Sequence, residues 1–201
     1  TASEARAVYA ADVDGDGDTD VLAASHYDTI SWYENDGSEN FIAHAITTST
    51  KGPVSVYAAD VDNDGDMDVL SASYSDDTIA WYENDGSENF TTHKITTSAD
   101  YASSIYAADV DGDGDMDVLS ASDGDDTIAW YENDGSENFI TRLITTSANG
   151  ANSVYSFDVD GDGDMDVLSA SGDDDTIAWY ENKSSPLVTA ETVTAETLPA
   201  Y

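Results

Sequence analysis

The chain has 201 residues and is strongly acidic, with 43 Asp and Glu against 5 Lys and Arg and a formal net charge of −38. This charge argues against nucleic acid and anionic membrane surfaces as partners, because both are negatively charged themselves. The chain contains no cysteine and no apolar run of about 20 residues, which excludes disulfides and a membrane-spanning helix, while a hydrophobic fraction of 40% supplies a core.

Four tandem units make up most of the chain, at about residues 8–55, 56–104, 105–153 and 154–186. Each unit is predicted to contain a first strand, an Asp-rich loop, a second strand, a polar turn and a third strand. In the first three units an Asn-Asp-Gly-Ser-Glu-Asn hairpin turn and a fourth strand follow. The predicted first strands are Val8–Val13, Val56–Val61, Ile105–Val110 and Val154–Val159; the second are Val21–Ser25, Val69–Ser73, Val118–Ser122 and Val167–Ser171; the third are Thr29–Glu34, Thr78–Glu83, Thr127–Glu132 and Thr176–Glu181; the fourth are Phe41–Thr47, Phe90–Thr96 and Phe139–Thr145.

The loop after each first strand has aspartates at positions 1, 3, 5, 7 and 9 and a glycine at position 6. Five carboxylates in nine residues repel one another unless a cation lies among them. Ca²⁺ takes six to eight oxygen ligands in a flexible geometry, whereas Mg²⁺ requires a stricter octahedron. We therefore predict about four calcium ions, one in each loop. The candidate metal residues are Asp12, Asp14, Asp16, Asp18, Asp20, Asp60, Asp62, Asp64, Asp66, Asp68, Asp109, Asp111, Asp113, Asp115, Asp117, Asp158, Asp160, Asp162, Asp164 and Asp166.

Within a loop the ligands are expected to alternate between side chains and backbone. In the second loop we assign side-chain ligation to Asp60, Asp62, Asp64 and Asp68, and a backbone carbonyl to Asp66. An EF-hand requires a bidentate glutamate at position 12 and a helix on each side. Position 12 is alanine or serine here, and the flanks carry no helical stripe, so the sequence excludes an EF-hand.

Tandem units of four short strands are typical of β-propeller blades. The third strand shows why such blades would stack, because Ile79 and Trp81 alternate with Ala80 and Tyr82 and both faces of the strand are apolar. A sheet of this kind must be covered on both sides, and neighbouring blades would do so. The predicted fold is therefore an all-β propeller of four four-stranded blades with one calcium loop per blade.

The loop signature Asp-x-Asp-x-Asp-Gly-x-x-Asp, together with the Ile-Ala-Trp-Tyr-Glu-Asn-Asp-Gly segment and the Asn-Phe strand, resembles the FG-GAP/VCBS-type repeats, relatives of the integrin α-subunit propeller. The resemblance covers roughly Val8 to Asn182. It implies calcium bound at the blade edge, with side chains from positions 1, 3, 5 and 9 and a carbonyl from position 7. It also implies an extracellular or cell-surface location, since the family includes adhesins, lectins and appendages of secreted enzymes.

The chain departs from this family in two respects. Integrin-like propellers usually have seven blades, so we expect either a small closed ring of four or part of a larger ring completed by a second copy. The fourth unit also loses the hairpin turn and the Asn-Phe strand. The propeller is thus expected to span residues 1–186, and the tail, residues 187–201, either supplies the outer strand through Leu187–Thr192 or pairs with a neighbouring molecule.

The sequence shows no nucleophile paired with a base, so a non-enzymatic function is expected. The leading interpretation is a calcium-binding module for adhesion or recognition at a cell surface, with an unknown protein or glycan ligand. The alternatives are a carbohydrate-binding lectin and a self-assembling subunit of a filament or ring. The four tryptophans could stack on sugars, but their place in the repeat favours the core between blades; they are Trp32, Trp81, Trp130 and Trp179.

Overall fold

The computed structural model of the chain describes residues 4–183 and 195–197, and this part is built from strands and turns. Its strands form four antiparallel sheets of four strands each, and neighbours in a sheet follow one another in the sequence. No helix long and apolar enough to cross a membrane occurs among the described residues. The sheets are β1 (Ala5–Ala11), β2 (Asp20–Ser25), β3 (Thr29–Asn35) and β4 (Phe41–Thr47); β5 (Pro53–Ala59), β6 (Asp68–Ser73), β7 (Thr78–Asn84) and β8 (Phe90–Thr96); β9 (Ala102–Ala108), β10 (Asp117–Ser122), β11 (Thr127–Asn133) and β12 (Phe139–Thr145); and β13 (Ala151–Phe157), β14 (Asp166–Ser171), β15 (Thr176–Tyr180) and β16 (Ala195–Thr197).

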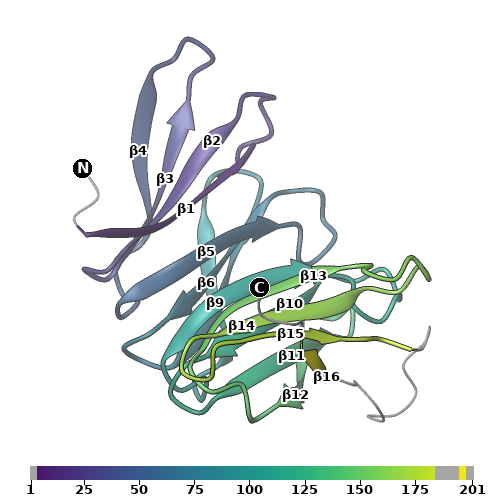
Figure 1. Ribbon diagram of the computed structural model, residues 1–201. Helices are drawn as coiled ribbons and strands as arrows, with labels where there is room; N and C mark the ends of the chain where they lie inside the picture. Colours follow the sequence, from purple (N-terminus) through teal and green to yellow (C-terminus); the bar gives the residue numbers. More distant parts are fainter. Residues whose placement is uncertain (1–3, 184–194, 198–201) are drawn as a thin grey trace.

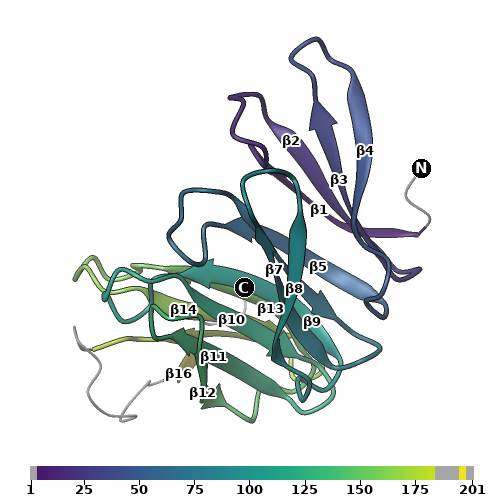
Figure 2. The same ribbon diagram turned by 180° about the vertical axis from the view of Figure 1, so that it is seen from behind.

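The four sheets are stacked in series, so that the β1–β4 sheet and the β13–β16 sheet lie at opposite ends of the molecule (Figures 1 and 2). Each sheet after the first begins with a strand that packs on the first strand of the sheet before it: β5 on β1, β9 on β5 and β13 on β9. The all-β prediction of four antiparallel four-stranded sheets is confirmed. Closure of these sheets into a four-blade ring is not seen in the described part of the chain, where the series is open.

The first strand of each unit ends before the residue predicted to close it. Val13 and Val61 fall in the loops and are nevertheless buried. Their backbone N–H groups donate to the carboxylates of Asp20 and Asp68, at 2.9 and 3.0 Å, instead of to a strand partner. A side-chain acceptor thus replaces the sheet ladder and ends the strand two residues early.

Apolar side chains fill the spaces between successive sheets. Between the second and third sheets, Val61, Ile79 and Trp81 share one core cluster with Ile105 and Tyr131. Both other junctions use the equivalent positions. The second and third strands of the two middle sheets are consequently buried on both faces, which explains their small and apolar residues.

Three of the four tryptophans lie in these junctions, whereas Trp179 in the last sheet is only half-buried. Trp32, Trp81 and Trp130 are all buried, as predicted. The fourth strands cover them from one side, since His44 and His93 stack on the first two rings at centroid distances of 4.6 and 4.5 Å. These three rings are therefore unavailable as platforms for a sugar ligand.

A row of tyrosines runs through the first strands of all four sheets. The ring centroids lie 4.5 Å apart between Tyr9 and Tyr57, 4.8 Å between Tyr57 and Tyr106, and 4.5 Å between Tyr106 and Tyr155. Such tilted contacts are favourable for aromatic pairs. The row fixes the first strands of successive sheets in the same register.

The last sheet obtains its fourth strand from the C-terminal tail. Residues Ala195–Thr197 pair with β15 in an antiparallel register that places Glu196 opposite Trp179. The strand expected at Leu187–Thr192 lies outside the described residues. The other fourth strands have seven residues and this one has three, so the outer edge of the last sheet is the shortest.

Candidate metal sites

The aspartate at position 9 anchors each loop to its own sheet. Asp68 is fully buried at the start of β6. One of its carboxylate oxygens accepts the N–H of Val61 at 3.0 Å, and the other accepts the N–H of Asn84 at 2.8 Å. The same pair of bonds recurs in the other three loops. This carboxylate therefore joins the loop, the second strand and the end of the third strand at one point.

Aspartates at positions 1, 3 and 9 come together in all four loops. In each group, one ligand atom per residue lies within 4.8 Å of the other two, a spacing that could hold a metal ion. The groups consist of Asp12, Asp14 and Asp20; Asp60, Asp62 and Asp68; Asp109, Asp111 and Asp117; and Asp158, Asp160 and Asp166. Twelve of the twenty candidate residues thus converge, three in each loop.

The aspartates at position 5 are not part of these groups and instead shape the loop. Asp64 Oδ1 accepts the N–H of Asp66 at 2.8 Å, and Asp62 Oδ1 accepts the N–H of Asp64 at 3.2 Å. Asp16, Asp113 and Asp162 make the equivalent bond to position 7. These short-range bonds curl the backbone around the group formed by positions 1, 3 and 9.

The side chains at position 7 turn away from that group toward the hairpin turn of the same sheet. A Cβ atom built on Gly86 would lie 2.3 Å from Asp66 Oδ2, and Gly37 and Gly135 stand in the same relation to Asp18 and Asp115. The turn glycine therefore leaves the space that the aspartate occupies. This placement is consistent with the prediction that position 7 offers only its backbone carbonyl; Asp164 belongs to the fourth loop, where the turn glycine is replaced.

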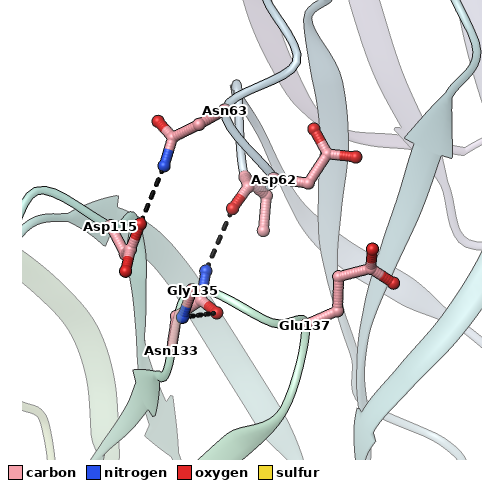
Figure 3. A pocket seen from close by; sticks show the side chains of 7 residues that line it. Asp62, Asn63, Asp115, Asn133, Gly135 and Glu137 are labelled. Carbon is pink, nitrogen blue, oxygen red and sulfur yellow. Dashed lines mark hydrogen bonds between the residues drawn. The ribbon is translucent and has the colours of Figure 1, made fainter.

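Neighbouring loops are joined by asparagines for which the sequence pattern predicts no such contact. Asn133, at the end of β11, donates from Nδ2 to Val61 O in the preceding loop at 3.0 Å. Asn63 donates from Nδ2 to Asp115 Oδ1 at 2.9 Å, so two amides bridge the second and third loops (Figure 3). Asn84 and Asn182 make the equivalent contact to Val13 O and Val110 O. The signal was present in the sequence, because Asn182 persists although the rest of its turn is lost.

Burial raises the pKa of several of the carboxyl groups that would bind the ion. The pKa of Asp68 rises to about 6 and that of Asp117 to about 7, because burial disfavours the charged form more than the backbone hydrogen bonds favour it. Burial also raises the pKa of the position-3 carboxyls Asp14, Asp62 and Asp111. A bound cation would reverse these shifts, since it favours the ionised form of every carboxyl it contacts.

Two buried oxygens indicate that the loops suit a cation. Asp12 Oδ1 and Asp60 Oδ1 are buried and have no hydrogen-bond partner among the described residues. A buried carboxylate oxygen without a partner is costly, and a hard cation satisfies it directly. Both atoms belong to residues of the convergent groups, so the donor set fits a hard cation.

Comparisons with known proteins agree with this geometry. A family model described as "FG-GAP-like repeat" matches residues 12–71, 60–120 and 109–169, and each match runs from one aspartate loop into the next. These matches together cover well over half of the chain. A comparison with curated protein sequences found no significant match.

Two solved structures share the fold at low sequence identity. The crystal structure of the V. cholerae biofilm matrix protein Bap1 matches with a TM-score of 0.59 and 23% identity, over 87% of this chain and 26% of that one. The crystal structure of BBS1N in complex with ARL6DN, soaked with lead, matches with a TM-score of 0.61 and 13% identity, over 88% of this chain and 53% of that one. The chain therefore spans only part of the length of either structure.

Proposed function

Because the chain belongs to the FG-GAP-like repeat family, whose repeats are typical of extracellular proteins, we propose that it is an extracellular calcium-binding module for adhesion or recognition at a cell surface. The observation that carries this proposal is the recurrence of one convergent Asp triad in every loop. Four equivalent sites on four equivalent sheets suggest a repeated structural ion that holds a recognition surface in shape. The sheets would act as propeller-type blades.

The residues of the chain assign a clear role to each part of such a site. Positions 1, 3 and 9 would hold the ion, and position 9 would transmit its effect to the sheet through the backbone bonds described above. Position 5 keeps the loop curled. A calcium ion supplies charge neutralisation in the loop, and metal binding then contributes to the free energy of folding.

The acidic surface favours partners that are neutral or basic over nucleic acid and anionic membranes. Of the two alternatives, the lectin loses most of its argument because three of the four tryptophans are buried in the core and only Trp179 is half-buried. A glycan ligand would have to bind through other residues. The self-assembling alternative has a structural basis of its own, because apolar side chains are exposed on the first and the last sheet.

Binding to surfaces in the presence and absence of calcium tests the proposal. The purified chain is applied to a panel of cell surfaces and to a glycan array, in calcium and in chelator. The matched control carries Asn in place of the position-1 aspartates Asp12, Asp60, Asp109 and Asp158. We expect attachment that requires both calcium and intact loops. Absence of attachment to every surface, or attachment unchanged in the control, would overturn the proposed function.

A further inference from the structure

The three internal junctions between sheets are copies of one interface. The earlier sheet contributes the residues equivalent to Val61 and Ile79, and the later sheet contributes those equivalent to Ile105 and Tyr131. Each sheet therefore has two different faces, one that packs on the sheet before it and one that packs on the sheet after it. Within residues 4–183 and 195–197, one face of the first sheet and one face of the last sheet pack on no further sheet.

The β1–β4 sheet exposes the face that would pack on a preceding sheet. Val8 is 71% exposed, whereas the equivalent residues Val56, Ile105 and Val154 are 4–5% exposed. Phe41 is also exposed, although Phe90 and Phe139 pack against core clusters. We call this surface, which contains Val8, Tyr33 and Phe41, the first free face.

The β13–β16 sheet exposes the opposite face. Ile177 is 49% exposed, whereas its equivalents Ile30, Ile79 and Ile128 are fully buried. Val159 and Tyr155 are exposed as well, in contrast to Val61, Val110 and the inner members of the tyrosine row. We call this surface, which contains Tyr155, Phe157, Val159 and Ile177, the last free face.

Each end sheet also carries one partner of the polar contacts that join the sheets at the internal junctions. In the first sheet Asn35 Nδ2 donates to Thr19 O of its own sheet. Its equivalents bridge to the valine carbonyl of the preceding loop, and Val159 in the fourth loop carries the corresponding carbonyl. The first sheet thus holds a donor, and the last sheet holds its acceptor.

A second polar pair follows the same rule. Asp77 Oδ1 accepts the N–H of Tyr101 at 3.0 Å, and Asp126 Oδ1 accepts the N–H of Gly150 at 3.0 Å, in both cases between successive sheets. The equivalent aspartate of the last sheet, Asp175, is exposed, and the equivalent N–H of the first sheet belongs to Glu4. All six of these residues have positive φ, so both halves already have the backbone conformation of the internal junctions.

We propose that the last free face of one copy docks on the first free face of a second copy and repeats the internal junction between chains. The argument rests on continuity with an interface that the chain forms three times, and it does not depend on the calcium proposal. Val8, Phe41 and Ile177 become buried in such a junction, Asn35 reaches Val159 O, and Tyr155 extends the tyrosine row to Tyr9 of the next copy.

The two free faces also differ from the internal junctions in side-chain size, and the two differences compensate each other. The last free face has Phe157 where the other sheets have alanine. The first free face has Thr19 where the later sheets have methionine. In the junction between the second and third sheets, Ala59 and Met116 pack with one core cluster. A larger residue on one end therefore meets a smaller one on the other, as a paired interface requires.

The interface joins two different surfaces, so it is heterologous. A heterologous contact gives a closed ring if its rotation closes and an open series if it does not. Two copies that satisfy both junctions reciprocally would form a ring of eight sheets. Reciprocal dimers and longer open series contain the same junction, so either assembly would support the proposal.

Two charge substitutions test the junction from its two sides. Val8→Asp and Ile177→Asp each place a carboxylate at the centre of one free face, and both sites are exposed enough for each variant to fold. Leu143→Asp is the matched control, because Leu143 is 63% exposed on β12 of the third sheet, away from both ends. Mass is measured by sedimentation in calcium and at about 0.15 M salt, where the Debye length is about 8 Å and the high net charge is screened.

We expect the wild type and Leu143→Asp to self-associate, and each end variant alone to associate at least about tenfold more weakly, since a buried unpaired charge is costly. Mixing Val8→Asp with Ile177→Asp leaves one intact face on each, so the mixture should form dimers that stop at one junction. A monomeric wild type, end variants that associate like the wild type, or a mixture that stays monomeric would each overturn the proposal. Calcium uptake by the same samples is measured separately, so a failure of the metal sites is distinguishable from a failure of the junction.

Discussion

The asparagine that joins neighbouring loops offers a quantitative test of how the sheets are held together. Asn133→Ala removes the bonds from Nδ2 to Val61 O at 3.0 Å and to Met116 O at 3.2 Å, and the bond from Gly135 N–H to Oδ1 at 3.2 Å. At about 1 kcal/mol for each net hydrogen bond, the loss amounts to about 3 kcal/mol. Only the bond to Val61 crosses between sheets.

The first sheet provides the matched control. Asn35 donates to Thr19 O at 3.2 Å and accepts from Gly37 N–H at 3.3 Å, both within its own sheet, so Asn35→Ala should cost about 2 kcal/mol. The difference of about 1 kcal/mol corresponds to about 2–4 °C in melting temperature for a chain of this size. Thermal melts followed by circular dichroism, at a concentration where the protein is monomeric, measure both. Equal melting temperatures for the two variants would refute the role assigned to the inter-sheet amide.

Two further predictions concern the loops. Burial raises the folded-state pKa of Asp68 to about 6 and of Asp117 to about 7, above the unfolded value. The chelated protein should therefore gain stability as pH falls from about 8 to about 5. Calcium should weaken or reverse this trend, since protons and the ion compete for the same carboxylates. Melting temperatures across this range, with and without chelator, measure it, and chelated protein that is more stable at the higher pH would contradict it. Gly86→Ala should destabilise more than Gly65→Ala, because both have positive φ but only the first would place a Cβ against Asp66, while nothing lies within 4 Å of the second. Urea unfolding measures the stability of the two variants, and the Asp66→Ala background should abolish the difference in stability between them. A difference that persists in this background would show that the turn glycine is not there to accommodate the aspartate.

Much of the fold follows from local patterns that the sequence repeats. The alternation around Trp81 predicts a sheet covered on both faces, and the structure places apolar neighbours on both sides of β7. The fourth strands, such as Phe41–Thr47, begin and end where the pattern predicts. Closure was harder to predict, because it depends on the angle between successive sheets, and no single repeat encodes that angle.

The candidate sites show the same division between pattern and geometry. Spacing alone predicts a cation among the aspartates, and the structure brings positions 1, 3 and 9 together. The spacing does not distinguish Asp64, which curls the loop, from Asp62, which joins the group, because both alternate in the same way along the chain. The turn conformation decides where each carboxylate lies, since Asp62 also accepts a backbone N–H, that of Asp64, and yet joins the group.

The most direct test of the account is the number of calcium ions that the chain binds. Native mass spectrometry and isothermal titration calorimetry are applied to the wild type and to Asp60→Asn, which alters only the second loop. The account predicts about four ions for the wild type, about three for the variant, and a lower melting temperature after chelation. A wild-type chain that takes up no calcium, and that melts at the same temperature with and without chelator, would contradict the central claim that the loops are metal sites.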